Sequence, residues 1–138
     1  MKNKESKIKL ASIKRNFWEL ESGVKRHKEN PKTFEIPSSK ERKNLKTGQA
    51  AKLIFQIELE NEDGNPVIVV ERMWVIVIGR LGKFFRGILS NRPAMFDSSD
   101  FELREGAEII FRPKHVISID DSDSTIALAK EKYGHLYT

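Results

Sequence analysis

Histidine is the side chain best suited to acid–base and metal chemistry near neutral pH, and the sequence has three of them. His27, His115 and His135 lie far apart along the chain, and none has a partner at the spacing of a metal site. A solitary histidine is more often structural than ligating, because ligating histidines come with further ligands and hydrogen-bonded supports. The histidines therefore predict no metal site.

Acidic residues offer two further candidates. The run Asp120–Asp123 begins like a calcium-binding loop, but Ile126 stands where that loop requires glycine. We interpret the run as solvated acids before a short tail helix, where negative charge is favourable. Asp97 and Asp100 fall in a loop with no sign of a pocket, so no carboxylate pair is nominated for acid–base catalysis.

The search for other chemistry gives negative results. Glycine-rich phosphate loops and the serine-nucleophile motif are absent, and there is no cysteine for thiolate catalysis, disulfides or cysteine-ligated metals. The segment Lys83–Arg86 interleaves basic and aromatic residues, as a base-stacking surface does. We expect its two phenylalanines to be core residues instead, because each hairpin must bury one face. The sequence thus predicts no enzyme and no cofactor.

Length and composition place the chain among small globular domains. It has 138 residues, of which 38% are hydrophobic and 33% charged, enough for one domain spanning residues 1–138. No apolar run reaches the roughly 20 residues that cross a membrane, and the charged opening lacks the apolar region of a secretory signal. Together with the lack of cysteine, these features predict a cytoplasmic protein without a membrane partner.

Positive charge is concentrated in the first part of the chain. Residues 1–50 contain 14 Lys and Arg against 6 Asp and Glu, whereas residues 51–138 contain 11 against 14. Such asymmetry is typical of an arm that binds nucleic acid, although it is more often a solvated face. Both interpretations stay open at this point.

The basic segment, residues 1–30, is predicted to be an amphipathic helix. Its apolar residues recur at spacings of three and four, and they form one stripe on a helix. Trp18 lies off this stripe, and we expect it at the edge of the packed surface. Asn30-Pro31 should end the helix, because the residue before proline avoids helical geometry. The stripe consists of Leu10, Ile13, Phe17, Leu20 and Val24.

The core, residues 31–119, is predicted to be rich in β-strands. Ser38 and Glu41 have capping-box spacing for a short helix, and alternating residues from Ala51 to Leu59 form a strand. The turn Asn61–Pro66 leads to a return strand whose segment Met73–Ile78 is apolar on both faces. The N-terminal helix is expected to cover one of these faces.

The rest of the core and the tail complete the predicted fold. Phe84–Ser90 should form a second hairpin with the preceding strand, followed by a loop over residues 94–107. Two short strands, Glu108–Arg112 and His115–Ile119, precede an acidic turn and a tail helix within residues 120–138. The prediction is an α+β domain: an N-terminal helix packed on a strongly bent antiparallel sheet, or small barrel, of about five or six strands.

The register of the second hairpin predicts a specific surface. A turn centred on Leu81-Gly82 places Trp74 opposite Leu89 and Arg72 opposite Asn91, on one face. The loop ending at His115 would then close over this end of the hairpin. The alternative is that Arg72 pairs with a carboxylate and Asn91 caps the turn. The predicted interaction patch consists of Arg72, Trp74, Asn91, Arg92 and His115.

Four segments within residues 31–119 carry a family resemblance. They are PKTFEIPSSKERKNLKTGQAAKLIF, ERMWVIV, GILSNRP and EGAEIIFRPKHVISI, in this order. Together they resemble a group of small bacterial domains of unknown function, related to the presumed immunity proteins of polymorphic toxin systems. The resemblance transfers no catalytic residue, and it implies a non-enzymatic module.

Two functions remain as hypotheses. The favoured one is a bacterial cytoplasmic protein-interaction module, immunity-like in that it neutralises an enzyme by covering it, with an unidentified protein partner and unknown oligomeric state. The alternative is a nucleic-acid-binding accessory protein that uses the basic N-terminal third. Survival of a captured partner after nuclease treatment would distinguish them.

Overall fold

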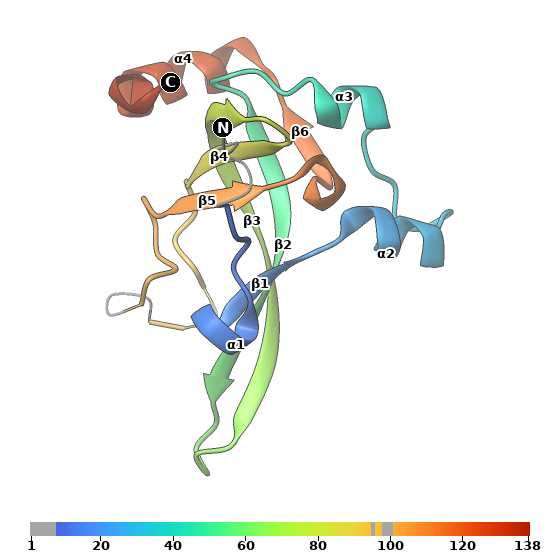
Figure 1. Ribbon diagram of the computed structural model, residues 1–138, viewed down its shortest axis with the longest axis vertical. Helices are drawn as coiled ribbons and strands as arrows, with labels where there is room; N and C mark the ends of the chain where they lie inside the picture. The colour runs from blue at the N-terminus through green and yellow to red at the C-terminus, as the bar shows by residue number, and fades with distance from the viewer. Residues whose placement is uncertain (1–7, 95, 98–100) are drawn as a thin grey trace, which may run out of the picture.

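The computed structural model describes residues 8–94, 96, 97 and 101–138, and within them the chain forms a curled antiparallel sheet flanked by short helices (Figure 1). The sheet follows the order β1-β2-β3-β4-β5, and β6 pairs with the same edge of β2 as β1. This arrangement confirms the predicted α+β class with a strongly bent sheet, which closes to a half-barrel. The strands are β1 Trp18–Glu21, β2 Ala50–Glu60, β3 Pro66–Leu81, β4 Phe84–Leu89, β5 Glu108–Phe111 and β6 Ser118–Asp120.

Several helices were predicted from local signals. Ser38 and Glu41 form the predicted capping box on α3 (Ser39–Lys43), because each side chain accepts from the other residue's backbone N–H. The tail helix is α4, and its N-cap is Ser122. The helical elements are α1 Ile13–Asn16, α2 Gly23–Glu29, α3, α4 Asp123–Tyr133, and the 3₁₀ turns η2 Pro113–His115 and η3 Gly134–Leu136.

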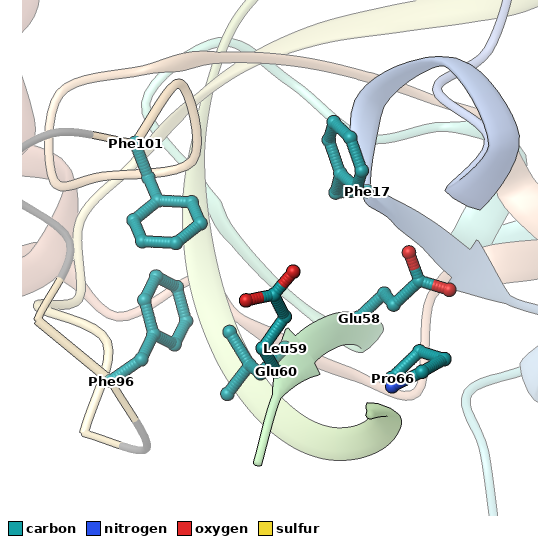
Figure 2. Close-up of a pocket in the computed structure, with 7 residues that line it drawn as sticks. All are labelled: Phe17, Glu58, Leu59, Glu60, Pro66, Phe96 and Phe101. Carbon is teal, nitrogen blue, oxygen red and sulfur yellow. The ribbon is translucent and has the colours of Figure 1, made fainter. Parts of the chain in front are cut away.

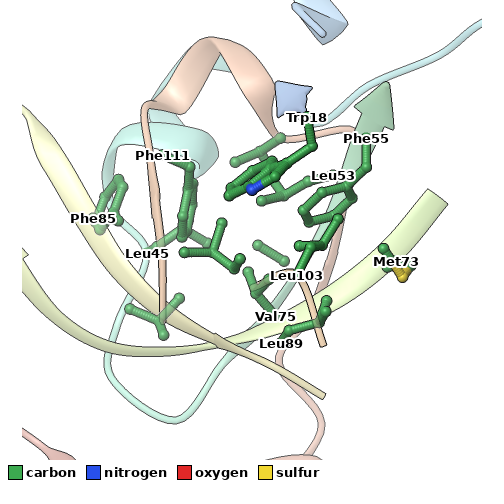
Figure 3. Close-up of a cluster of buried hydrophobic side chains, with 14 of the residues drawn as sticks. Trp18, Leu45, Leu53, Phe55, Met73, Val75, Phe85, Leu89, Leu103 and Phe111 are labelled. Atoms are coloured by element: carbon green, nitrogen blue, oxygen red, sulfur yellow. The ribbon is translucent and has the colours of Figure 1, made fainter. Parts of the chain in front are cut away.

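The main core fills the concave side of the sheet (Figure 3). The Trp18 ring lies 5.7 Å from that of Phe55, and the Phe85 ring lies 5.5 Å from that of Phe111, between ring centroids. Leu103 comes from the connection between β4 and β5 and is 2% exposed, so this connection is anchored in the core. The core thus joins all four strand pairs from β1 to β5.

The central segment of β3 is apolar on both faces, as predicted, but a different helix covers its second face. Ile76 and Ile78 pack on the convex side of the sheet against Ala129 and Tyr133 of α4. The predicted cover was the N-terminal helix. The C-terminal helix supplies this cover instead (Figure 1).

The prediction of one continuous N-terminal helix is wrong. α1 ends after one turn, Phe17 adopts a left-handed backbone with φ of 65°, and the chain continues as β1 before α2 begins. Trp18, expected at an edge, is 6% exposed and lies in the main core, whereas Phe17 is 57% exposed. The same residues satisfy a strand alternation, and antiparallel pairing of β1 with β2 selects it.

The predicted register of the β3–β4 hairpin is also wrong. The strands pair directly from Leu81 to Phe84, so the turn consists of Gly82 and Lys83, with Gly82 at φ of 59°. A bulge between Val77 and Gly79 then shifts the register by one residue, and Val75 rather than Trp74 lies opposite Leu89. The predicted strand from His115 begins later, at Ser118, because Pro113–His115 forms a 3₁₀ turn.

Candidate binding site: an aromatic pocket at the turn end of the β2–β3 hairpin

A pocket of about 770 Å³ opens on the concave side of the sheet, beside the turn end of the long β2–β3 hairpin (Figure 2). Three phenylalanine rings line it from segments far apart in sequence, together with the end of β2 and the start of β3. Its volume is in the range of pockets that hold small molecules or inserted side chains. The lining residues are Phe17, Glu58, Leu59, Glu60, Pro66, Phe96 and Phe101.

Phe17 reaches the pocket through an unusual backbone conformation. Phe17 is the residue directly after α1, and its φ is positive. Its N–H donates to the carbonyl of Ile13 in that helix. Its own carbonyl accepts a 2.8 Å hydrogen bond from the N–H of Glu58. A left-handed phenylalanine costs about 1–3 kcal/mol, and such strain is concentrated at functional sites. The left-handed conformation ends α1 as its C-cap, and most of the Phe17 ring stays exposed toward the pocket.

The opposite wall is formed by the connection between β4 and β5. The Phe96 and Phe101 rings meet edge to face, with 5.1 Å between their centroids. Phe96 packs against the main core, as does Leu59 at the pocket floor, while Phe101 is 39% exposed. Figure 2 shows the Phe17 ring on one side and this pair on the other, with Leu59 between them. The pocket can therefore accept an apolar side chain between aromatic walls.

The rim of the pocket is acidic. Glu58 and Glu60 lie on β2 at its mouth, and the adjoining turn adds Glu62 and Asp63. Residues 58–70 contain these four acids and no basic residue, although the chain as a whole carries a formal charge of +5. The pocket and hairpin thus form an acidic, apolar region on a basic protein, and we expect them to attract positively charged partners.

Relief of the strain at Phe17 gives the first prediction. Phe17→Gly should raise the free energy of unfolding by about 1 kcal/mol, because glycine adopts positive φ without a steric cost and little packing is lost. Urea unfolding followed by circular dichroism measures the change. Phe17→Leu is the matched control, since it keeps the strain and should give no stabilisation. A loss of stability in the glycine variant would contradict the proposed strain.

The structure brings together two of the residues in the predicted patch. The Trp74 N–H donates to Oδ1 of Asn91, so this asparagine caps the backbone of the neighbouring strand. Arg72 shares the convex face with Trp74, but its guanidinium lies over the Phe34 ring at 5.3 Å instead of meeting Asn91. Arg92 is exposed beside Asn91. The register that carried the patch is wrong, and the patch has no structural support as one surface.

His115, the fifth residue of the predicted patch, is a core residue and 3% exposed. Its Nδ1 accepts a 2.9 Å hydrogen bond from the N–H of Arg112, which requires the neutral ring. Burial, together with the smaller effects of the positive charges of Lys114 and Arg112, lowers the pKa of His115 to about 4. A side chain held in this way is part of the packed core.

The other chemical candidates also have structural explanations. Asp120 accepts hydrogen bonds from the Ser122 N–H and the Thr125 hydroxyl, which hold the pKa of its carboxyl below its usual value. Phe85 is buried, as expected of a core residue. The described part of the chain contains no cluster of three or more potential metal-binding residues. No helix among the described residues has both the length and the apolar character needed to cross a membrane.

No local pattern in the sequence predicts the aromatic pocket. Phe17 was assigned to a buried helical stripe, and residues 94–107 were expected to be a loop. Phe17 meets Phe96 and Phe101 only because the sheet curls and brings two distant segments together beside the end of β2. The dense acidic turn after β2 was visible in the sequence, but its place beside an apolar pocket depends on tertiary structure.

Comparison with known proteins gives no relative. No family model, curated protein or solved structure matches the chain. The resemblance to small bacterial domains of unknown function therefore stays a prediction.

Proposed function

We propose that this protein is a non-enzymatic interaction module that binds a protein partner through the aromatic pocket. The observation that carries the proposal is the exposed, strained Phe17 facing Phe96 and Phe101 across the pocket. A partner inserts an apolar side chain between the rings, and the complex gains from burying them. The family resemblance favours an immunity-like role within this class, in which the bound partner is an enzyme that is neutralised by being covered.

Nucleic-acid binding is less well supported by the arrangement of the aromatic residues. Arg26 and Arg72 both lie over the Phe34 ring, and Lys52 lies over Trp74, so these rings already contact the chain's own cations. Arg26 is also paired with Glu21 at 3.0 Å. A base-stacking surface needs exposed ring faces beside cations available for phosphate. The aromatic pocket has ring faces, but its neighbouring charges are acidic.

Photocrosslinking tests the proposed function. Benzoylphenylalanine placed at Phe101 in the full chain should form a discrete covalent adduct with one protein in cells, and nuclease treatment should not remove it. Leu128 of α4 is the matched control position, because it is 66% exposed and lies away from the pocket. The proposal is wrong if both positions give the same adducts, or if position 101 gives only nuclease-sensitive ones.

A further inference from the structure

The outer edge of β3 is exposed along the projecting half of the hairpin. Among the described residues, β4 pairs with β3 only from Val75 to Leu81, so the stretch from Pro66 to Arg72 has no neighbouring strand on that side. Figure 1 shows this half of the hairpin extending beyond the body of the molecule. A sheet edge of this kind offers backbone N–H and C=O groups to another chain.

The pairing pattern shows which backbone groups point outward. The Trp74 N–H donates to Asn91 and the Trp74 C=O accepts from Ser90, so both groups point away from β2. In an antiparallel pair, the backbone groups of successive residues point alternately toward the partner strand and away from it. The N–H and C=O groups of Arg72, Val70 and Ile68 therefore face the open edge, whereas those of Val69 and Glu71 face β2. The Glu58 N–H agrees with this assignment, because it points to Phe17 and away from its β3 partner Ile68.

The middle of this edge lacks the usual protection against pairing. Proteins blunt exposed edges with proline, charges or bulges, and Pro66 and Glu71-Arg72 stand at the two ends, but residues 67–70 are Val-Ile-Val-Val without a charge. Ile68 and Val70 are 50% and 44% exposed on the convex face. On the concave face, the edge borders the connection that carries Phe96, since the Ala94 N–H bonds to the Glu71 carboxylate. A strand added here would direct alternate side chains toward the aromatic pocket.

We propose that β3 binds an extended, basic and apolar segment of a protein partner by strand addition along Ile68, Val70 and Arg72. This inference rests on the proposed function and names its binding mode. Backbone hydrogen bonds supply the pairing, the apolar side chains of the segment point to the concave face and the pocket, and its Lys or Arg residues face the four acids of the hairpin. The charge of this region selects a basic segment over a second copy, whose own hairpin is acidic.

Amide hydrogen exchange with defined peptides tests the inference. The probe is a capped heptapeptide of alternating Lys and Val, compared with a Glu and Val peptide of the same length. At saturating probe we expect exchange at Ile68, Val70 and Arg72 to slow by about tenfold or more, as for amides newly paired in a sheet. Val69 and Glu71 should change little, since their amides already pair with β2. The Glu and Val peptide should leave all five amides unchanged.

Two variants make the test specific. Val70→Pro removes an outward-facing backbone N–H without breaking the β2–β3 ladder, and it should lower the affinity for the Lys and Val peptide by about tenfold. Val70→Thr keeps this N–H and should leave the affinity unchanged. Replacing the four acids of the hairpin with their amides should lower the affinity for the Lys and Val peptide by a similar factor at low salt. These acids are Glu58, Glu60, Glu62 and Asp63. Melting curves establish that each variant is folded.

Three results would overturn the inference. The first is equal protection of the edge amides by both peptides, and the second is no protection by either peptide. The third is protection that rises with protein concentration in the absence of peptide, which would mean that a second copy occupies the edge. A probe that shifts the signals of Phe96 and Phe101 without protecting the edge amides would refute strand addition while leaving the proposed pocket function standing. Failure of the crosslinking experiment, in contrast, would refute the pocket function itself.

Discussion

Trp18→Ala is expected to lower the free energy of unfolding by about 4 kcal/mol, which is in the range for removing a large buried ring. The indole is 6% exposed and packs on Phe55 in the main core, so its removal leaves a cavity beside β2. Because small domains have only about 5–15 kcal/mol of stability, the variant should be close to unfolding. Guanidinium unfolding monitored by circular dichroism measures the loss.

The neighbouring residue is a matched control for Trp18. Phe17→Ala should change the free energy of unfolding by less than about 1 kcal/mol, because the Phe17 ring is mostly exposed. Trp18→Phe should cost much less than alanine, since it keeps a ring against Phe55. It also removes an indole N–H that has no acceptor among the described residues. If residues 10–24 formed one continuous amphipathic helix, Phe17→Ala would cost more stability than Trp18→Ala. A larger loss for Phe17→Ala would therefore contradict the observed β1.

The N-terminal segment shows why sequence periodicity alone was insufficient. Residues 10–24 fit a helical stripe, yet Trp18 and Leu20 alternate with two glutamates as in a strand. The choice is made by the β2 edge, which pairs with β1 over Glu21 to Trp18 and which no local pattern reveals. Elements with strong local signals, such as the α3 capping box and the β2–β3 turn, were predicted because their determinants lie within a few residues.

Register and site were harder to predict for related reasons. The bulge between Val77 and Gly79 is a one-residue irregularity, and one residue is enough to move a side chain to the other face of a sheet. The predicted patch was argued from the wrong register, so the structure gives that argument no support. The aromatic pocket depends on the curl of the whole sheet, which alternation within single strands does not specify. Sequence patterns therefore located β2 to β5, but not β1 or the surface that the strands form.

The buried His115 should make stability depend on pH in a defined window. Burial lowers its pKa in the folded state to about 4, whereas a histidine in the unfolded chain titrates near pH 6.5. Between these values the unfolded state binds the proton and the folded state does not, so stability falls as the pH falls. The full difference corresponds to about 3 kcal/mol, which is present above pH 6.5 and lost on acidification to about pH 4.

His115→Asn separates this effect from the titration of carboxylates. Asparagine retains an acceptor for the Arg112 N–H near the position of Nδ1 but cannot be protonated in this range. Urea unfolding at several pH values from 4 to 8 should show a steeper loss of stability in the natural chain than in the variant. The difference between the two curves should be confined to the range from about pH 4 to pH 6.5. Parallel curves would mean that His115 is accessible to protons in the folded state, which contradicts its place in the core.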